Sequence, residues 1–140
     1  MAKKLKTIAY GHDVGDFLLQ EAARRISSCV REMDAVARFG GDEFVVVLTE
    51  LDMNKIESIA QTGIVAEKIR SALAWPYRLT VQQKGKTECA IKHQCTSSIG
   101  VMLFINHEAS LVDVIKCADM AMYQAKAAGR NLILFYDAKN

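Results

Sequence analysis

The chain has 140 residues, of which 51% are hydrophobic and 24% are charged. This composition excludes a disordered chain and supplies one hydrophobic core, so we expect residues 1–140 to form a single domain. The net charge of +2 argues against a groove for a long nucleic acid polymer, although it leaves room for a local phosphate site. No apolar run approaches membrane-spanning length and no secretory region follows the basic N-terminus, which predicts a cytoplasmic domain without membrane contact.

The cysteines and histidines show no spacing typical of metal ligands, so a transition-metal site is not expected. The histidines are His12, His93 and His107. The cysteines include no Cys-x-x-Cys pair and lie mostly in apolar surroundings, which favours reduced thiols over a disulfide framework. They are Cys29, Cys89, Cys95 and Cys117.

The N-terminal third predicts one amphipathic helix. Met1–Tyr10 is basic and alternates only weakly, so no structure is assigned to it. Residues 11–16 predict a loop, and Asp16, or a residue before it, can cap a helix that runs to about Met33. The apolar stripe of this helix consists of Leu18, Leu19, Ala22, Ile26 and Val30.

A β-hairpin is predicted next. Two runs rich in β-branched and aromatic residues, Ala35–Phe39 and Phe44–Leu48, flank Gly40-Gly41, a pair that tolerates the positive φ of a two-residue turn. The second run is almost wholly apolar, which predicts a strand buried on both faces inside a larger sheet.

This second strand begins with two adjacent carboxylates, Asp42 and Glu43. Successive side chains of a strand point to opposite faces, so at most one of the two can be a direct metal ligand. Acids beside a glycine turn are also common as solvated turn residues, and the hairpin alone does not decide between these interpretations.

The second half of the chain alternates helices and strands, which predicts an α/β sandwich. A second amphipathic helix ends at Pro76, and its apolar stripe is Ile56, Ile59, Ala60, Gly63, Ala66, Ile69 and Leu73. The strands expected after it are Tyr77–Val81, Glu88–Gln94, Thr96–Ile105 and Asn131–Tyr136.

A last helix is predicted between Ser110 and Gly129. Ser110 and Asp113 have the spacing of a capping box, and Gly129 is expected to end the helix as its C-terminal cap. The residues expected to face inward are Leu111, Val114, Ile115, Ala118, Met122 and Ala125.

Five groups of residues resemble, in the same order, the signatures of the GGDEF family, bacterial diguanylate cyclases that condense two GTP into cyclic di-GMP. The groups are Tyr10–Asp16, Arg31-x-x-Asp34, the Arg-Phe-Gly-Gly-Asp-Glu-Phe run of Arg38–Phe44, Ser98–Gly100, and Ala118–Lys126 with Gly129–Asn131. The resemblance implies a nucleotidyl-cyclase-like sheet, derived from the ferredoxin-like fold, with helices on both faces. It also implies a homodimer, because the two GTP halves meet between two domains, and an upstream sensory domain in a longer protein. Ser98–Gly100 we interpret as structural, a strand of small residues that packs closely against its neighbours.

The resemblance assigns roles to the residues of the hairpin turn. It implies that Asp42 binds Mg²⁺ or Mn²⁺ and is the candidate proton acceptor, and that Glu43 is a second catalytic candidate. Gly40 and Gly41 are then part of the GTP site. Mg²⁺ prefers one or two carboxylates together with phosphate oxygens, which fits this assignment.

The remaining substrate contacts are also implied by the resemblance. Lys126 and Arg130 lie four residues apart, hence on one face of the last helix, and would meet the β- and γ-phosphates. Cations at that place can alternatively complement the helix dipole. Asp16 would contact guanine, with His12 in the same loop, although a helix N-cap remains an alternative for Asp16.

Arg31 and Asp34 match the family's inhibitory site, which binds the product cyclic di-GMP. An arginine and an aspartate three residues apart are also an ordinary surface ion pair. This match gives a second functional hypothesis, a non-catalytic cyclic di-GMP receptor or signalling module that binds through these two residues.

The chain departs from the family at its start. Members of the family open with a helix and a central strand that carries a second metal-binding aspartate, whereas no acid precedes Asp13 here. The family's guanine-reading asparagine either falls at Thr7 or is deleted. We therefore expect the first helix and the central strand to be lacking and the cyclase activity to be impaired, with Lys3–Ala9, or another chain, filling the gap in the sheet.

Overall fold

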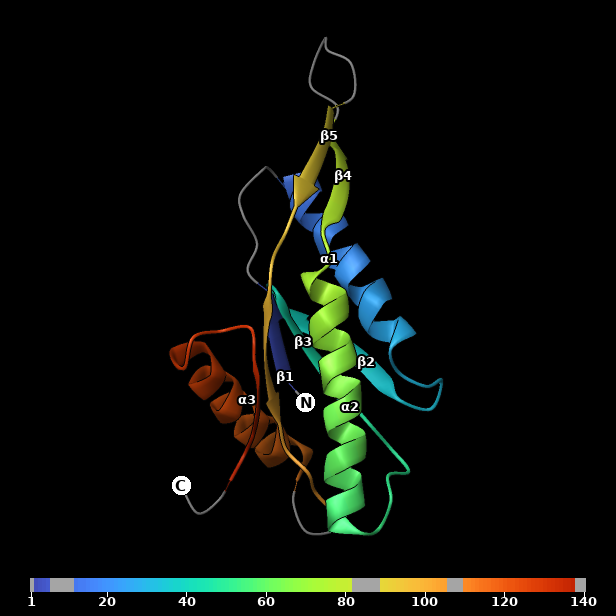
Figure 1. Ribbon diagram of the computed structural model, residues 1–140, viewed down its shortest axis with the longest axis vertical. Coiled ribbons are helices and arrows are strands. Elements are labelled where there is room, and N and C mark those ends of the chain that lie inside the picture. Colours follow the sequence, from blue (N-terminus) through green and yellow to red (C-terminus); the bar gives the residue numbers. More distant parts are fainter. Residues whose placement is uncertain (1, 6–11, 82–88, 106–109, 138–140) are drawn as a thin grey trace.

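The computed structural model describes residues 2–5, 12–81, 89–105 and 110–137 (Figure 1). The helices are α1 (His12–Ser28), α2 (Lys55–Ala74) and α3 (Leu111–Ala127). The strands are β1 (Ala2–Leu5), β2 (Ala35–Gly40), β3 (Glu43–Val47), β4 (Tyr77–Val81), β5 (Cys89–His93), β6 (Ser97–Val101) and β7 (Ile133–Phe135). Within these ranges, no helix has both the length and the apolar composition needed to cross a bilayer.

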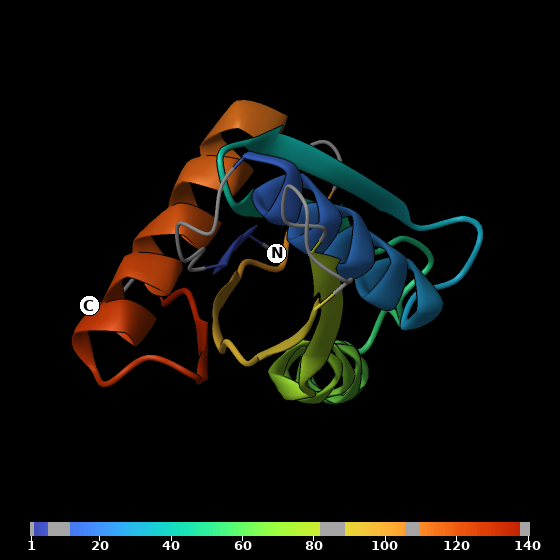
Figure 2. The ribbon, with the colours of Figure 1, turned by 90° about the horizontal axis from the view of Figure 1, so that it is seen from above.

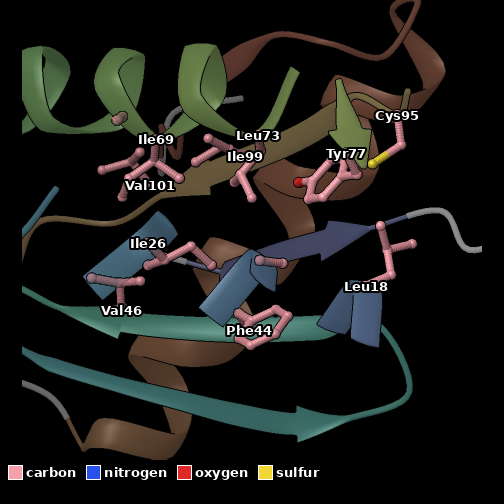
Figure 3. Packing of buried hydrophobic residues seen from close by; sticks show 12 residues of the cluster. Leu18, Ile26, Phe44, Val46, Ile69, Leu73, Tyr77, Cys95, Ile99 and Val101 are labelled. Carbon is pink, nitrogen blue, oxygen red and sulfur yellow. The ribbon is translucent and has the colours of Figure 1, made fainter. Parts of the chain in front are cut away.

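Five strands form a central sheet in the order β2-β3-β1-β6-β7, and β4 and β5 form a separate hairpin. Helix α3 covers one face of the sheet, while α1 and α2 lie on the other (Figures 1 and 2). The core on that face is built from the sheet, from α1 and α2 and from Tyr77 of β4 (Figure 3), and its largest members include Ile26, Phe44, Val46, Ile69, Leu73, Tyr77, Ile99 and Val101. The α/β fold with helices on both faces is thus confirmed.

The centre of the sheet is occupied by β1, which pairs antiparallel with β3 on one side and with β6 on the other. Lys3 is the register partner of both Phe44 and Ile99. The prediction that Lys3–Ala9 fills the gap at the centre of the sheet is therefore confirmed for Lys3–Leu5, while Lys6–Ala9 lies outside the described residues. Filling it matters because each backbone group left unpaired in a sheet interior costs about 1–3 kcal/mol.

The predicted hairpin is present. β2 and β3 pair antiparallel with Arg38 opposite Phe44 and Gly40 opposite Glu43, and the register shifts between Arg38 and Gly40. Residues Phe44 to Val46 are buried, and because successive side chains of a strand point to opposite faces, β3 is covered on both faces. The prediction of a strand buried on both faces is confirmed.

Helix α3 packs directly on the backbone of β6. A Cβ on Gly100 would lie 2.0 Å from the carbonyl oxygen of Ala118 and 2.4 Å from the nitrogen of Met122, so only glycine fits there. This contact confirms the interpretation of Ser98–Gly100 as a closely packed strand. Strand β6 is shorter than predicted, and Leu111, expected to face inward, is exposed.

Helix α1 starts at His12, within the stretch 11–16 predicted as a loop, and ends at Ser28 instead of about Met33. Its early start puts Asp16 inside the helix near its N-terminus, where a negative charge is favourable to the helix dipole. At its end, the nitrogen of Cys29 donates to the oxygen of Ile26 at 3.0 Å, a tight bond that closes the last turn.

Arg25 ties α1 to the turn between α2 and β4. Its guanidinium donates to the carbonyl oxygens of Ala72 (2.8 Å), Trp75 (2.8 Å) and Pro76 (3.0 Å) and lies 3.8 Å from the centroid of the Tyr77 ring. The carbonyl of Ala72 is the acceptor that Pro76, which has no N–H, leaves without a helical donor, and the other two carbonyls belong to the turn after α2. One side chain therefore satisfies acceptors of both the helix end and the turn.

The buried side of α2 differs from the predicted stripe over its first half. Ser58 and Thr62 are buried there, while Ile56, Ile59 and Ala60 are exposed. The hydroxyl of Thr62 donates to the oxygen of Ser58 at 2.7 Å, and the hydroxyl of Ser58 donates to Lys55 at 3.0 Å. Because these hydroxyls are satisfied inside the helix, they can be buried at little cost, and apolar periodicity alone gave the wrong face.

Candidate functional site

One end of the central sheet gathers the residues that the sequence singled out. Lys4 is the register partner of Glu43, Leu5 of Ser97, and Ile99 of Ile133. The end of β1 and the beginnings of β3, β6 and β7 therefore lie together, and we call this place the hairpin end of the sheet. β3 and β7 are three strand spacings apart there, or about 14 Å.

The hairpin turn is shaped by two glycines in the left-handed region, Gly40 with φ of 110° and Gly41 with φ of 54°. The Nε atom of Arg38 donates to the carbonyl oxygen of Gly41 at 2.9 Å and holds the turn from the side. Asp42 and Glu43 follow immediately and are both half-buried. The turn thus presents a carboxylate pair at the hairpin end.

Metal-binding groups are sparse in the part of the chain that the structure describes, where no three His, Cys, Asp or Glu side chains gather as a metal site. The strand beside β3 has the sequence Ala-Lys-Lys-Leu and supplies no carboxylate. Asp42 and Glu43 can therefore provide part of a divalent-ion site, completed by substrate phosphates, but not a closed protein cage.

The end of α3 brings Lys126 and Arg130 to the start of β7, at the hairpin end. The helix stops at Ala127, so the two cations do not share a helix face as predicted. Gly129, with φ of 122°, terminates it: the nitrogen of Arg130 donates to the oxygen of Ala125 at 3.0 Å and that of Gly129 to Lys126 at 3.4 Å. This is the glycine cap that the sequence predicted, and its geometry turns Arg130 out of the helix.

The two cations differ in their surroundings. Lys126 is half-buried, with its ammonium 5.4 Å from the centroid of the Tyr123 ring, while Arg130 is exposed. The neighbouring Asn131 accepts a hydrogen bond from Arg70 of α2 at 2.8 Å, which fixes the segment that carries Arg130.

His12 and Asp16 both belong to the start of α1. Asp16 is exposed and lies inside the helix, so it is not the N-cap that was weighed for it. His12 is the first residue of the helix, and its side chain lies outside what the structure describes.

Arg31 and Asp34 form one network with Thr49, which follows β3. Asp34 accepts from the nitrogen of Arg31 (2.9 Å), from its Nε (3.4 Å) and from the nitrogen of Thr49 (3.0 Å), and Arg31 also donates to the oxygen of Thr49. Burial would raise the pKa of Asp34, but the two N–H groups and the guanidinium together lower it below its ordinary value. The carboxylate is thus held by its own chain, while the guanidinium remains half exposed.

Thr49 is the member of this network that sequence reasoning missed. It acts through its backbone, with only a further contact of its hydroxyl to the oxygen of Met33 at 3.3 Å. Backbone donors leave no residue-type signal, so no motif could have indicated this position.

Known proteins resemble this chain in sequence and in fold. The sequence model of the family described as "Diguanylate cyclase, GGDEF domain" matches residues 3–132. The chain belongs to this family. The Ser98–Gly100 strand, the glycine turn and the end of α3 lie within the matched range.

The chain is 37% identical over 124 residues to Diguanylate cyclase A of Treponema denticola, an alignment that covers 89% of the chain and 30% of that protein. It is 34% identical over 130 residues to the bifunctional diguanylate cyclase/cyclic di-GMP phosphodiesterase MucR of Pseudomonas aeruginosa, covering 93% of the chain and 17% of that protein. Thus the chain spans less than a third of the length of these relatives.

Among solved structures, the GGDEF domain of YfiN (or TpbB) from Pseudomonas aeruginosa superposes with a TM-score of 0.76 at 30% identity, covering 97% of the chain and 81% of that structure. The cyclase-like fold of the GGDEF domain is therefore confirmed. Diguanylate cyclases of this family generally use a divalent metal ion.

Proposed function

We propose that this chain is the GTP-condensing domain of a diguanylate cyclase, which converts two GTP into cyclic di-GMP and pyrophosphate at a reduced rate. The observation that carries the proposal is the register of the sheet, in which the Gly-Gly-Asp-Glu turn and the basic end of α3 share one end. We further propose that it works as a homodimer in the cytoplasm, as one domain of a longer protein with an upstream sensory domain.

The proposed reaction joins a 3′-hydroxyl to an α-phosphorus. The hydroxyl oxygen of one GTP attacks the α-phosphorus of the other, the bond to the β-phosphate breaks, and pyrophosphate leaves; the same step in the opposite sense closes the ring. Asp42 accepts the proton of the attacking hydroxyl, with Glu43 as the second candidate, and passes it to water. A divalent ion, Mg²⁺ or Mn²⁺, would offset the charge of the triphosphate, with Asp42 as a ligand.

The other residues of the hairpin end bind and orient. Lys126 and Arg130 meet the β- and γ-phosphates, and charge-assisted bonds of this kind are the stronger hydrogen bonds of proteins. Gly40 and Gly41 let the nucleotide approach the backbone closely because neither has a side chain.

The guanine contact is proposed at the start of α1. The Asp16 carboxylate can accept from the ring N1–H and the 2-amino group of guanine, with His12 nearby in the same turn of chain. The exposure of Asp16 is compatible with this role.

The reduced rate is expected because the chain offers few carboxylates for a metal ion. β1 has the sequence Ala-Lys-Lys-Leu and offers no second metal carboxylate, so a divalent ion held by Asp42 would depend on phosphate and water oxygens for its other ligands. Product feedback would act through the half-exposed guanidinium of Arg31.

The test is turnover of GTP by the purified chain with Mg²⁺ or Mn²⁺, followed by chromatography of the products. We expect slow formation of cyclic di-GMP, and a loss of about a hundredfold or more in Asp42→Ala. Glu32→Ala is the matched control, because Glu32 is an exposed acid elsewhere on the surface. No product from the wild-type chain with either ion, or full activity of Asp42→Ala, contradicts the proposal.

A further inference from the structure

Helix α2 carries a group of exposed apolar residues away from its core side, interspersed with exposed polar residues such as Glu57 and Lys68. The core side runs through Ala66, Ile69 and Leu73. On the other side Ile56 is 77% exposed and Ile64 is 59% exposed. A helix that packs on a core by one side normally has a polar opposite side, so a group of exposed apolar residues there indicates a second partner.

The exposed side continues beyond both ends of α2. Met53, just before the helix, is fully exposed, and Trp75, just after it, is 70% exposed. Ile64 lies midway between them along the chain. We call these residues together with α2's outward side chains the outer α2 surface.

One half of this surface is hollow and the other protrudes. A hollow of about 830 Å³ runs along α2 beside the end of α1, with Gly63, Ala72 and Trp75 in its lining. A Cβ on Gly63 would meet nothing within 4 Å, so packing inside the chain does not require a glycine there. Met53 and Ile56, by contrast, lie outside the hollow.

We propose that a second copy of this chain covers the outer α2 surface, with the two α2 helices antiparallel and a two-fold axis at Ile64. Ile56 and Ala72 lie about 12 Å to either side of Ile64 at 1.5 Å per residue. The axis therefore sets Ile56 of each copy level with the partner's Ala72 along the helix, and Met53 level with the partner's Trp75. Each copy fills the hollow of the other with its own protruding side chains, as an isologous interface requires.

The charges of α2 support the same pairing. Glu57 and Lys68 are both exposed, and within the described ranges neither side chain takes part in an ion pair or a side-chain hydrogen bond. The antiparallel arrangement sets Glu57 about 4.5 Å along the helix axis from the partner's Lys68, within reach of two long side chains, and the two-fold axis repeats this contact. A parallel arrangement would instead set like charges opposite each other.

The outer α2 surface shares no residue with the hairpin turn or with the basic end of α3. This dimer contact is therefore distinct from the one in which two domains bring their bound GTP together, and it does not depend on the proposed activity. It leaves Asp42 and Arg130 uncovered by the contact.

Sedimentation equilibrium of the chain over a wide concentration range, without nucleotide, tests the proposal. We expect a reversible dimer, and a dissociation constant raised by about a hundredfold or more in Ile64→Glu, because two carboxylates would face each other at the axis. Met120→Glu on α3 is the matched control, with a starting exposure of 54% against 59%. It should leave the dimer intact, and both variants should keep the wild-type circular dichroism because both positions are exposed.

A charge exchange tests the antiparallel register itself. Glu57→Lys and Lys68→Glu should each weaken the dimer several-fold, and the double variant should restore it because both symmetric contacts are then reversed. A wild-type chain that stays monomeric at every concentration, an Ile64→Glu variant that still dimerises, or a double variant weaker than either single one overturns the proposal.

Discussion

Two arginine–carboxylate pairs of this protein have short spacings in sequence, four residues in one and three in the other, and opposite burial in the fold. In the pair of Arg25 and Glu21, the arginine side chain is 14% exposed and the glutamate 32%. In the pair of Arg31 and Asp34, the aspartate side chain is 2% exposed and the arginine 51%. In each pair the buried member bonds to backbone groups of a distant segment, so it fixes the fold, while the more exposed member keeps access to solvent and ligands.

The comparison shows that burial separates a charged residue that stabilises the fold from one that is free to bind a ligand, even within one motif. Arg25 holds the end of α2, and Asp34 holds the loop before β2 to the residue after β3. The proposed contact with the dinucleotide therefore falls on Arg31 alone. Within this motif, Asp34 then stabilises the fold and Arg31 contacts the ligand.

Replacing Arg25 should give the largest effect. Arg25→Met leaves three carbonyl oxygens of the α2–β4 turn without their donor and exposes the Tyr77 ring, so we expect a loss of about 3 kcal/mol in the free energy of unfolding. Arg24→Met is the matched control, because that guanidinium is exposed and pairs only with Glu21, and it should cost under about 1 kcal/mol. Urea denaturation measures both; equal losses would remove the distinction between the two arginines.

Splitting the second pair should give an intermediate effect on stability and a clear separation of roles. Asp34→Ala removes the acceptor of two backbone N–H groups and should cost about 2 kcal/mol. Arg31→Ala should cost under about 1 kcal/mol but weaken the binding of cyclic di-GMP, measured by calorimetry. Unchanged binding in a well-folded Arg31→Ala would show that this arginine is not the ligand contact.

Sequence reasoning performed well where a residue type indicates one local structure. Gly40-Gly41 and Gly129 marked left-handed backbone, and Ser110 marked a cap whose hydroxyl accepts from the nitrogen of Asp113 at 3.2 Å. Those signals placed the hairpin and the limits of α3 correctly.

Sequence reasoning failed where a side chain can be accommodated in two different environments. Ser58 can face solvent or satisfy its hydroxyl inside the helix, so the buried side of α2 could not be found from apolar periodicity. The site had a similar limit. The motifs indicated the acids and cations, but the Arg31 and Asp34 motif gave no sign of the backbone contacts of Thr49. That β3 and β7 start at the same end of the sheet was known only from the register of the strands.

The smallest effect that we predict is the acid dependence of the first pair. The hydrogen bond from Arg24, opposed in part by burial and aided by Arg25, lowers the pKa of Glu21 from 4.5 to about 2. A carboxylate with a lowered folded pKa contributes stability that is fully present above the unfolded value and is lost as the pH falls through the folded one. Unfolding titrations should therefore show stability declining between about pH 5 and pH 2, with part of the decline absent in Glu21→Gln. Asp34, whose pKa is also lowered, should account for the decline in stability that remains in that variant. If Glu21→Gln has the same slope as the wild type, the bonds of Glu21 to its two arginines do not stabilise the folded chain, and Arg25 is held by the carbonyl groups alone.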